Sequence, residues 1–130
     1  MNIGFDFHGV LNLKDDKFRK LAQRYREQGH SVHILTGPTE QQFLKEAEGL
    51  VEKGVHYDYL FSISDYLITK GHEFTGSKEF PVFADDVWND AKGEYAFYSN
   101  LDEHYDDFEE YGKYFPDTCK FFLVVNGEVQ

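Results

Sequence analysis

Short apolar runs that alternate with amphipathic stretches constrain the fold of this chain more than any other feature. Residues 2–7, 31–35 and 57–63 read as strands, and a stretch with helical spacing of its apolar residues follows each of them. This alternation is typical of a parallel sheet with helices packed against it. The pattern therefore predicts an α/β fold, a Rossmann-like three-layer domain with a mainly parallel central sheet.

The helices predicted between these strands have recognisable faces and ends. The first covers residues 15–28 and precedes Gly29, a residue suited to a helix C-terminus; its shared face carries Phe18, Leu21, Ala22 and Tyr25. Thr39 and Gln42 form a capping-box pattern that opens a second helix, predicted to end at Gly54, with an apolar stripe of Phe43, Leu44, Ala47, Leu50 and Val51. Residues 64–70 are predicted to form two further helical turns.

The second half of the chain has weaker signals. We expect a fourth strand of the central sheet at residues 81–84, a short strand at 95–98, an acidic helix over 101–115 and a last strand at 121–125. No repeat, linker or low-complexity segment divides the chain. The sequence thus predicts one domain over residues 1–130, a length that buries roughly two-thirds of the unfolded chain's surface.

The charge balance excludes one class of partner and leaves another open. The chain has 13 Lys and Arg against 24 Asp and Glu, a formal net charge of −11. Because nucleic-acid affinity rests on neutralising phosphates with basic side chains, this balance argues against general nucleic-acid binding. A small phosphorylated substrate remains compatible, since a bound cation changes the local sign of a site.

The sequence also indicates the cellular compartment of the protein. Cys119 is the one cysteine, so no disulfide can form within the chain, which fits a reducing compartment. No signal-peptide pattern opens the sequence, and no apolar run approaches the ~20 residues of a membrane span. We expect a soluble, cytoplasmic protein without a membrane segment.

Polar side chains gather where the predicted strands end. In a parallel α/β sheet, ligands bind outside the carboxyl ends of the strands, so residues at these positions are candidates for a site. They are Asp6 and His8 after the first strand, Thr36 and Gly37 after the second, Lys70 after the third, and Asp85, Asp86 and Asp90 after the fourth. Lys78 competes with Lys70, because it also precedes the fourth strand.

This collection has a chemical logic. Carboxylates that lie together repel one another unless a cation lies between them, and their hard oxygens suit Mg²⁺. Thr36 and the amides that open the next helix, Gly37 included, can bind phosphate oxygens. Lys70 supplies a fixed positive charge to a transferring phosphoryl group. Asp6 is the best placed carboxylate to act as a nucleophile and form an aspartyl-phosphate.

The order of these residues resembles that of the haloacid dehalogenase superfamily of phosphohydrolases, over residues 2 to about 90. The four matching motifs are residues 4–11 (GFDFHGVL), residues 33–37 (HILTG), the lysine Lys70, and residues 82–86 (VFADD) followed by Asp90. The resemblance implies that Asp6 is nucleophile and metal ligand, that Thr36 donates to phosphate and that Lys70 stabilises charge. It further implies a magnesium site of Asp6, the backbone carbonyl of His8, Asp85, and Asp86 or Asp90.

The chain departs from the family at two points. His8 stands where the family usually has a second Asp that acts as general acid and base, a role that histidine can perform. No segment is long enough for a separate cap domain, since only residues 9–14 follow the first strand before its helix, and residues 64–80 are too few to fold alone. A capless site suits a bulky phosphorylated substrate, or a partner subunit that closes it in a homo-oligomer.

Three functions compete on this evidence. The first is a magnesium-dependent phosphomonoester phosphatase that works through Asp6. The second keeps the fold and binds phosphate or metal in a recognition or regulatory role, because His8 replaces the usual acid. The third, a phospho-accepting receiver domain, fits less well, since its acidic pair would follow the first strand and its acceptor Asp the third. We therefore expect the phosphatase first and the non-catalytic binder second.

Overall fold

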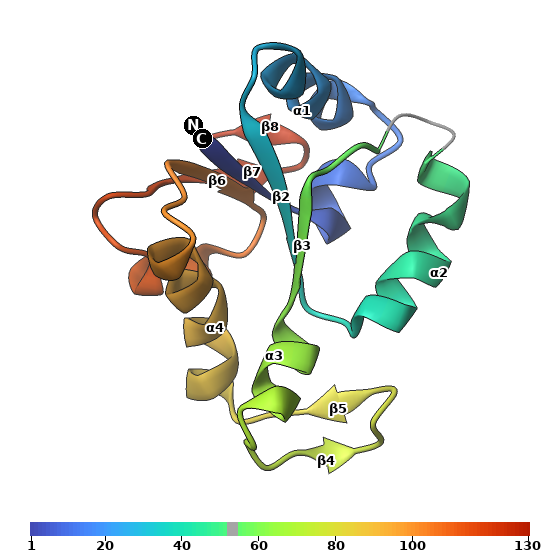
Figure 1. Ribbon diagram of the computed structural model, residues 1–130, viewed down its shortest axis with the longest axis vertical. Helices are drawn as coiled ribbons and strands as arrows, with labels where there is room; N and C mark the ends of the chain where they lie inside the picture. The colour runs from blue at the N-terminus through green and yellow to red at the C-terminus, as the bar shows by residue number, and fades with distance from the viewer. Residues whose placement is uncertain (52–54) are drawn as a thin grey trace.

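A computed structural model describes residues 1–51 and 55–130, and the side chains of all of these except residues 50 and 51. Its sheet and helices follow one another through the chain (Figure 1) as β1 (Asn2–Asp6), α1 (Lys17–Glu27), β2 (Ser31–Thr36), α2 (Glu40–Val51), β3 (Tyr59–Ser62), α3 (Ile63–Thr69), β4 (Thr75–Gly76), β5 (Pro81–Val82), α4 (Asp85–Tyr98), β6 (Glu103–Asp106), β7 (Lys120–Val125) and β8 (Glu128–Val129). A π-helical turn, η1 (Phe7–Leu11), follows β1, and a 3-10 helix, η2 (Glu109–Tyr114), follows β6.

Six strands form the central sheet in the order β3-β2-β1-β6-β7-β8. All neighbouring pairs are parallel except β7 and β8, which form an antiparallel hairpin. The predicted α/β class and mainly parallel sheet are therefore confirmed, and residues 1–51 and 55–130 include no large cap, as predicted. The strand β1 lies between β2 and β6, so its carboxyl end is flanked by residues from both halves of the chain.

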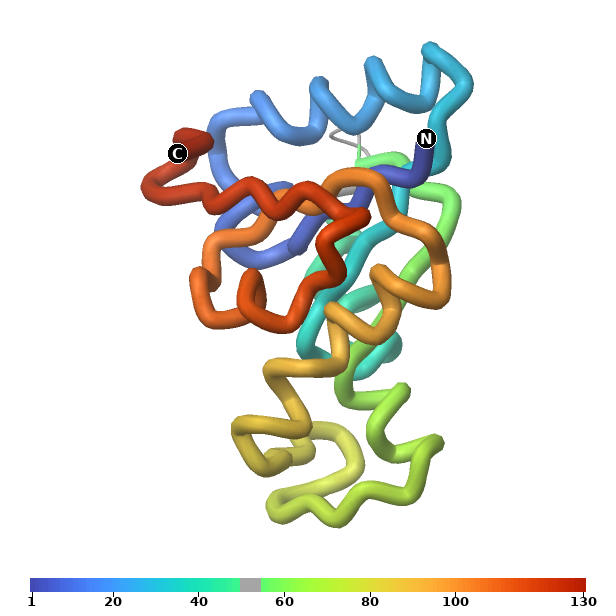
Figure 2. The backbone as a smooth tube through the Cα atoms, turned by 90° about the vertical axis from the view of Figure 1, so that its left-hand side faces the viewer, coloured from blue at the N-terminus to red at the C-terminus, as the bar shows by residue number. Residues whose placement is uncertain are grey.

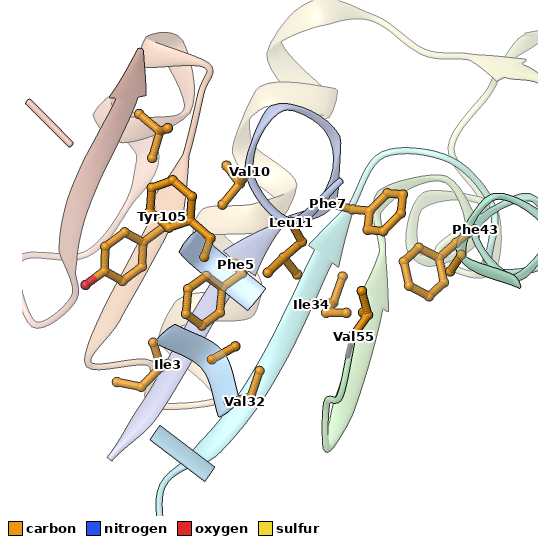
Figure 3. Close-up of a cluster of buried hydrophobic side chains, with 14 residues drawn as sticks. Ile3, Phe5, Phe7, Val10, Leu11, Val32, Ile34, Phe43, Val55 and Tyr105 are labelled. Atoms are coloured by element: carbon orange, nitrogen blue, oxygen red, sulfur yellow. The ribbon is translucent and has the colours of Figure 1, made fainter. Parts of the chain in front are cut away.

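Helices cover both faces of this sheet. On one face α1 and α2 pack on the strands through a core of large apolar side chains, shown in Figure 3, that includes Ile3, Phe5, Phe18, Val32, Ile34, Phe43 and Tyr105. On the other face α3 and α4 pack through a second core that includes Leu35, Phe61, Leu67, Ala91, Ala96 and Tyr111. Because side chains alternate along a strand, the residues between those of the first core point towards α3 and α4.

Most predictions for the first half of the chain are confirmed. The helix predicted over 15–28 is α1, the strand over 31–35 is β2, and the two turns predicted over 64–70 are α3. Gly29 adopts a φ of +89°, the left-handed conformation that ends many helices. The predicted end of α2 at Gly54, and the places of Leu50 and Val51 on its buried stripe, lie outside the described residues.

The second half corrects three predictions. Residues 81–84 were expected to add a strand to the central sheet, but β5 pairs only with β4 in a separate two-stranded sheet. Residues 95–98 belong to α4 and form no strand. The acidic helix expected over 101–115 is instead the strand β6 followed by η2, because parallel pairing with β1 and β7 holds residues 103–106 in extended backbone. The last strand, predicted over 121–125, is β7.

The β4–β5 hairpin lies at one end of the molecule. In Figure 1 it lies beyond α3, and in Figure 2 the same yellow-green segment projects below the body of the sheet. Phe80 and Val82 of this segment are exposed. The acidic pair Asp85-Asp86 follows the hairpin and lies in the first turn of α4.

Candidate functional site

The candidate site begins with Asp6, the last residue of β1. Asp6 alternates with Phe5, which lies in the core beneath α1 and α2, so its carboxylate points to the opposite face, where α4 packs. On the neighbouring strand β6, Tyr105 lies in the same core as Phe5, and Asp106 points with Asp6 towards α4. Parallel pairing of β1 and β6 thus brings two carboxylates together at the carboxyl end of the sheet.

Lys92 of α4 lies between these two carboxylates. Its Nζ is 3.0 Å from Oδ1 of Asp6 and 2.7 Å from Oδ2 of Asp106, and its side chain is 1% exposed. The ring of Tyr111 lies 4.6 Å from the same ammonium group. A buried ammonium group is tolerated only when it is paired, so these contacts explain why a lysine occupies the inward face of α4.

The three charged groups have strongly shifted pKa values. Burial by itself would lower the pKa of Lys92, but the carboxylates of Asp106 and Asp6 outweigh burial and raise it. Burial by itself would raise the pKa of Asp106, but Lys92 and His104 hold it well below its usual range. For Asp6, burial prevails: it raises the pKa well above the ordinary value, Lys92 offsets only part of this, and the charge of Asp106 adds to it.

A third carboxylate, Asp107, completes an acidic cluster. Carboxylate oxygens of Asp6, Asp106 and Asp107 all lie within 4.8 Å of one another, and Asp107 is exposed. Gly9, with a φ of +81°, makes room for it, since a Cβ at this position would lie 2.1 Å from Oδ2 of Asp107. With all three ionised, Lys92 leaves two negative charges uncompensated, and hard oxygen donors of this kind fit a divalent cation. The cluster could therefore hold a metal ion.

Thr36 and Gly37 lie at the end of the adjacent strand β2. Asp6 is in register with Leu35, so Thr36 follows one residue further along the same edge. Thr36 is fully buried, and its Oγ1 has no hydrogen-bond partner within the part of the chain that the structure describes, a costly state for a hydroxyl unless a ligand supplies one. Gly37 has no room for a side chain, because a Cβ would lie 2.8 Å from the ring of Trp88.

His8 lies outside the acidic cluster and contacts α2. Its Nε2 is hydrogen-bonded to the carboxylate of Glu46, and both side chains are partly exposed, 44% and 43%. The imidazole supplies no ligand atom to the group formed by Asp6, Asp106 and Asp107. The metal contact predicted for His8 concerned its backbone carbonyl, and that prediction stays open.

The other predicted site residues lie elsewhere. Lys70 ends α3, is exposed, and pairs with Glu94 at 3.4 Å. Asp85 and Asp86 are exposed in the first turn of α4. Asp90 lies on the same helix, and its pKa is raised by burial and, to a smaller extent, by Glu94. Asp85 precedes Lys92 by seven residues, roughly 10 Å along the helix axis. Among the described residues, the group that Asp6 forms with Asp106 and Asp107 includes neither Asp85, Asp86 nor Asp90, and the strand β5 before them is absent from the central sheet. The ammonium group at Asp6 is that of Lys92, whereas Lys70 pairs with Glu94.

The residues that sequence reasoning missed are Lys92, His104, Asp106 and Asp107. One signal was present for Lys92: it lies four residues after Trp88 and four before Ala96, on the apolar stripe of a helix, where lysine is unusual. Asp106 and Asp107 form a second acidic pair, but the surrounding charges resembled a solvated helix face. Only pairing of β6 with β1 reveals them.

Comparisons with known proteins leave the family open. No protein-family model, no curated protein and no solved structure matches this chain. The described residues also include no helix of the length and apolar character needed to cross a bilayer.

Proposed function

We propose that this chain is a magnesium-dependent phosphomonoester phosphatase with Asp6 as nucleophile. The observation that carries the proposal is the buried Lys92, which joins Asp6 to Asp106 beside the exposed carboxylate of Asp107. The resemblance to the haloacid dehalogenase superfamily requires a nucleophilic Asp, a Thr, a Lys and an acidic pair, in that order. Lys92 and Asp106-Asp107 meet this order in place of Lys70 and Asp85-Asp86.

The residues divide the chemistry among them. A carboxylate oxygen of Asp6 attacks phosphorus, the ester P–O bond breaks, and an aspartyl-phosphate forms. Water then attacks phosphorus, phosphate leaves, and the carboxylate is restored. Lys92 stabilises negative charge on the transferring group, and the Thr36 hydroxyl, which has no partner in residues 1–51 and 55–130, donates to a phosphate oxygen.

Three carboxylates are available to hold the magnesium ion. Asp107 is exposed and the side chain of Asp6 is 9% exposed, whereas Asp106 is fully buried and accepts hydrogen bonds from Lys92 and His104. When bound, magnesium supplies charge neutralisation and orientation of the phosphate oxygens. It would also favour ionised Asp6, whose pKa is raised by burial in its absence.

His8 is proposed as the group that protonates the leaving oxygen and later accepts a proton from water. Glu46 binds Nε2, so Nδ1 is the nitrogen left to face a substrate. The lack of a large cap suits a bulky phosphate ester, or closure by a second copy of the chain. A cytoplasmic location also remains our proposal, and it fits the single cysteine, Cys119, which is buried and forms no disulfide within the chain.

The test is a screen of aryl and alkyl phosphate esters with and without magnesium, in the parent and in Asp6→Asn. We expect magnesium-dependent release of phosphate in the parent, and a loss of at least about 10³-fold in Asp6→Asn because its nucleophile is gone. Asp85→Asn is the matched control, since Asp85 is an exposed aspartate at the start of α4, and should retain activity. Turnover that persists in Asp6→Asn would contradict the proposal.

The second candidate is a non-catalytic protein that binds phosphate or metal for recognition. The observation that favours it concerns His8, which stands where the family usually has its acid and base: here this residue is hydrogen-bonded to Glu46. Under this reading, magnesium still stabilises the parent against heat, but no ester is hydrolysed. Appearance of turnover in His8→Asp, with none in the parent, would select this second candidate.

A further inference from the structure

His104 is a buried titratable residue that the proposed chemistry leaves unused. It lies on β6 two residues before Asp106, with no exposed surface, and its Nε2 is 2.8 Å from Oδ2 of Asp106. An ionised carboxylate only accepts hydrogen bonds, so His104 donates from Nε2. The geometry thus assigns the tautomer with its proton on Nε2.

The acceptor of this bond is the same oxygen that binds Lys92. Oδ2 of Asp106 accepts from His104 and from Lys92 Nζ at 2.7 Å, and Oδ1 accepts from the backbone N–H of Phe108 at 3.2 Å. Three donors from three directions hold the carboxylate in one orientation. Among the described residues, the anionic partners of Lys92 are Asp106 and Asp6, so the orientation of Asp106 determines where the ammonium group lies relative to Asp6.

The imidazole is itself held firmly. Its ring stacks on Phe115, with centroids 4.9 Å apart and an interplanar angle of 16°, and it lies beside Phe121. On the β1 side it lies against Gly4, where a Cβ would be 2.5 Å from Nδ1. Glycine at this position therefore makes room for the ring, which lies between β1 and Phe115.

We propose that His104 is a positioning residue that acts through Asp106 to hold the Lys92 ammonium group at Asp6. This inference rests on the proposed function for its catalytic consequence, and on the contacts alone for its structural one. Without the donor from His104, Asp106 can rotate, and Lys92 then no longer meets the phosphoryl group at a fixed place. Because the ammonium stabilises the transferring group, the loss falls on kcat and leaves KM nearly unchanged.

The variants are chosen to separate positioning from packing. His104→Phe keeps the aromatic ring that stacks on Phe115 and removes the donor. His104→Gln restores an N–H donor at similar reach. His33→Phe is the matched control, because His33 is another buried histidine of the sheet, and its hydrogen bonds among the described residues go to Tyr95 and Asn2 and not to Asp106.

Kinetics on an aryl phosphate at saturating magnesium is the first measurement. We expect kcat of His104→Phe to fall about 10-fold, equivalent to ~1.4 kcal/mol, with KM within about twofold of the parent. His104→Gln should recover most of kcat, and His33→Phe should keep it even where the melting temperature falls equally. An equal fall of kcat in His33→Phe, or no recovery in His104→Gln, would overturn the positioning role.

NMR gives a readout that needs no turnover, so it separates failure of this inference from failure of the phosphatase proposal. A buried, hydrogen-bonded lysine ammonium exchanges slowly enough to be observed by ¹⁵N NMR. We expect the Lys92 signal in the parent, in His104→Gln and in His33→Phe, and its broadening in His104→Phe. An unchanged Lys92 signal in His104→Phe overturns the inference. If His104→Phe does not fold, the parent suffices: a proton on Nδ1 of His104 in place of Nε2 would remove the donor on which the inference depends.

Discussion

Asp85-Asp86 and Asp106-Asp107 are two acidic pairs that lie at or just after the end of a short strand, yet their surroundings differ completely. Asp85 and Asp86 are exposed in the first turn of α4, where carboxylates interact favourably with the helix dipole. Asp106 is buried against Lys92, and Asp107 joins it in a cluster with Asp6. The strand before the first pair is isolated with β4, whereas the strand before the second pairs with β1. Neighbouring strands therefore decide which pair can act with Asp6.

The largest expected difference between the pairs is in stability. Asp106→Asn removes a buried charge and leaves Lys92 with one anionic partner, which should cost ~3–5 kcal/mol of unfolding free energy. Asp86→Asn changes an exposed side chain and should cost less than about 1 kcal/mol. Urea denaturation at neutral pH measures both. Equal, small losses of unfolding free energy in the two variants would mean that the ion pair of Asp106 with Lys92 does not stabilise the fold.

The lysines offer a parallel comparison in activity. Lys92→Met should lower kcat by at least about 10²-fold, since it removes the positive charge next to Asp6. Lys70→Met should leave kcat unchanged, because Lys70 is exposed and pairs with Glu94. Phosphate release at saturating magnesium measures the two variants, with circular dichroism to confirm that each is folded. A loss in Lys70→Met as large as in Lys92→Met would restore the assignment expected from the sequence.

The two acidic pairs should also differ, by a smaller amount, in their effect on the stabilisation that magnesium gives. Magnesium at about 100 times its dissociation constant should stabilise the parent by ~2.7 kcal/mol. Asp107→Asn should lose most of that gain, because it removes an exposed ligand of the cluster, whereas Asp85→Asn should keep it. Melting temperatures with and without magnesium chloride give the answer. Stabilisation that is lost in Asp85→Asn instead would place the metal at the start of α4.

The smallest effect concerns Asp6 without metal. Because burial raises its pKa, the folded state disfavours ionised Asp6, and the parent loses stability as pH rises above the ordinary carboxyl range of ~3.9 through the raised value. Asn does not ionise, so Asp6→Asn should be the more stable protein at pH 7 in chelator. The difference should vanish below about pH 4. Thermal denaturation between pH 4 and 8 measures it, and a variant that is less stable at pH 7 would show that the Lys92 contact outweighs burial.

Local sequence predicted the helices and strands correctly where the residues of the element themselves determine its structure. The spacing of Phe18, Ala22 and Tyr25 predicted α1, and Gly29 marked its end. Asp6 and Thr36 were found as strand-end residues, because β1 and β2 are apolar runs with clear ends. Local sequence predicted a helix in place of β6, because residues Glu103 to Asp106 include only one good strand former, Tyr105.

The sequence by itself determined the α/β class and the nucleophile candidate Asp6, since apolar periodicity and strand ends are local properties. Tertiary structure decided the rest of the site. Lys92 is a basic residue in the core only because Asp6 and Asp106 surround it, and Asp106 lies beside Asp6 only because β6 pairs with β1. The physical reason is that burial of a charge depends on partners from distant segments, and no local pattern records which strands are neighbours.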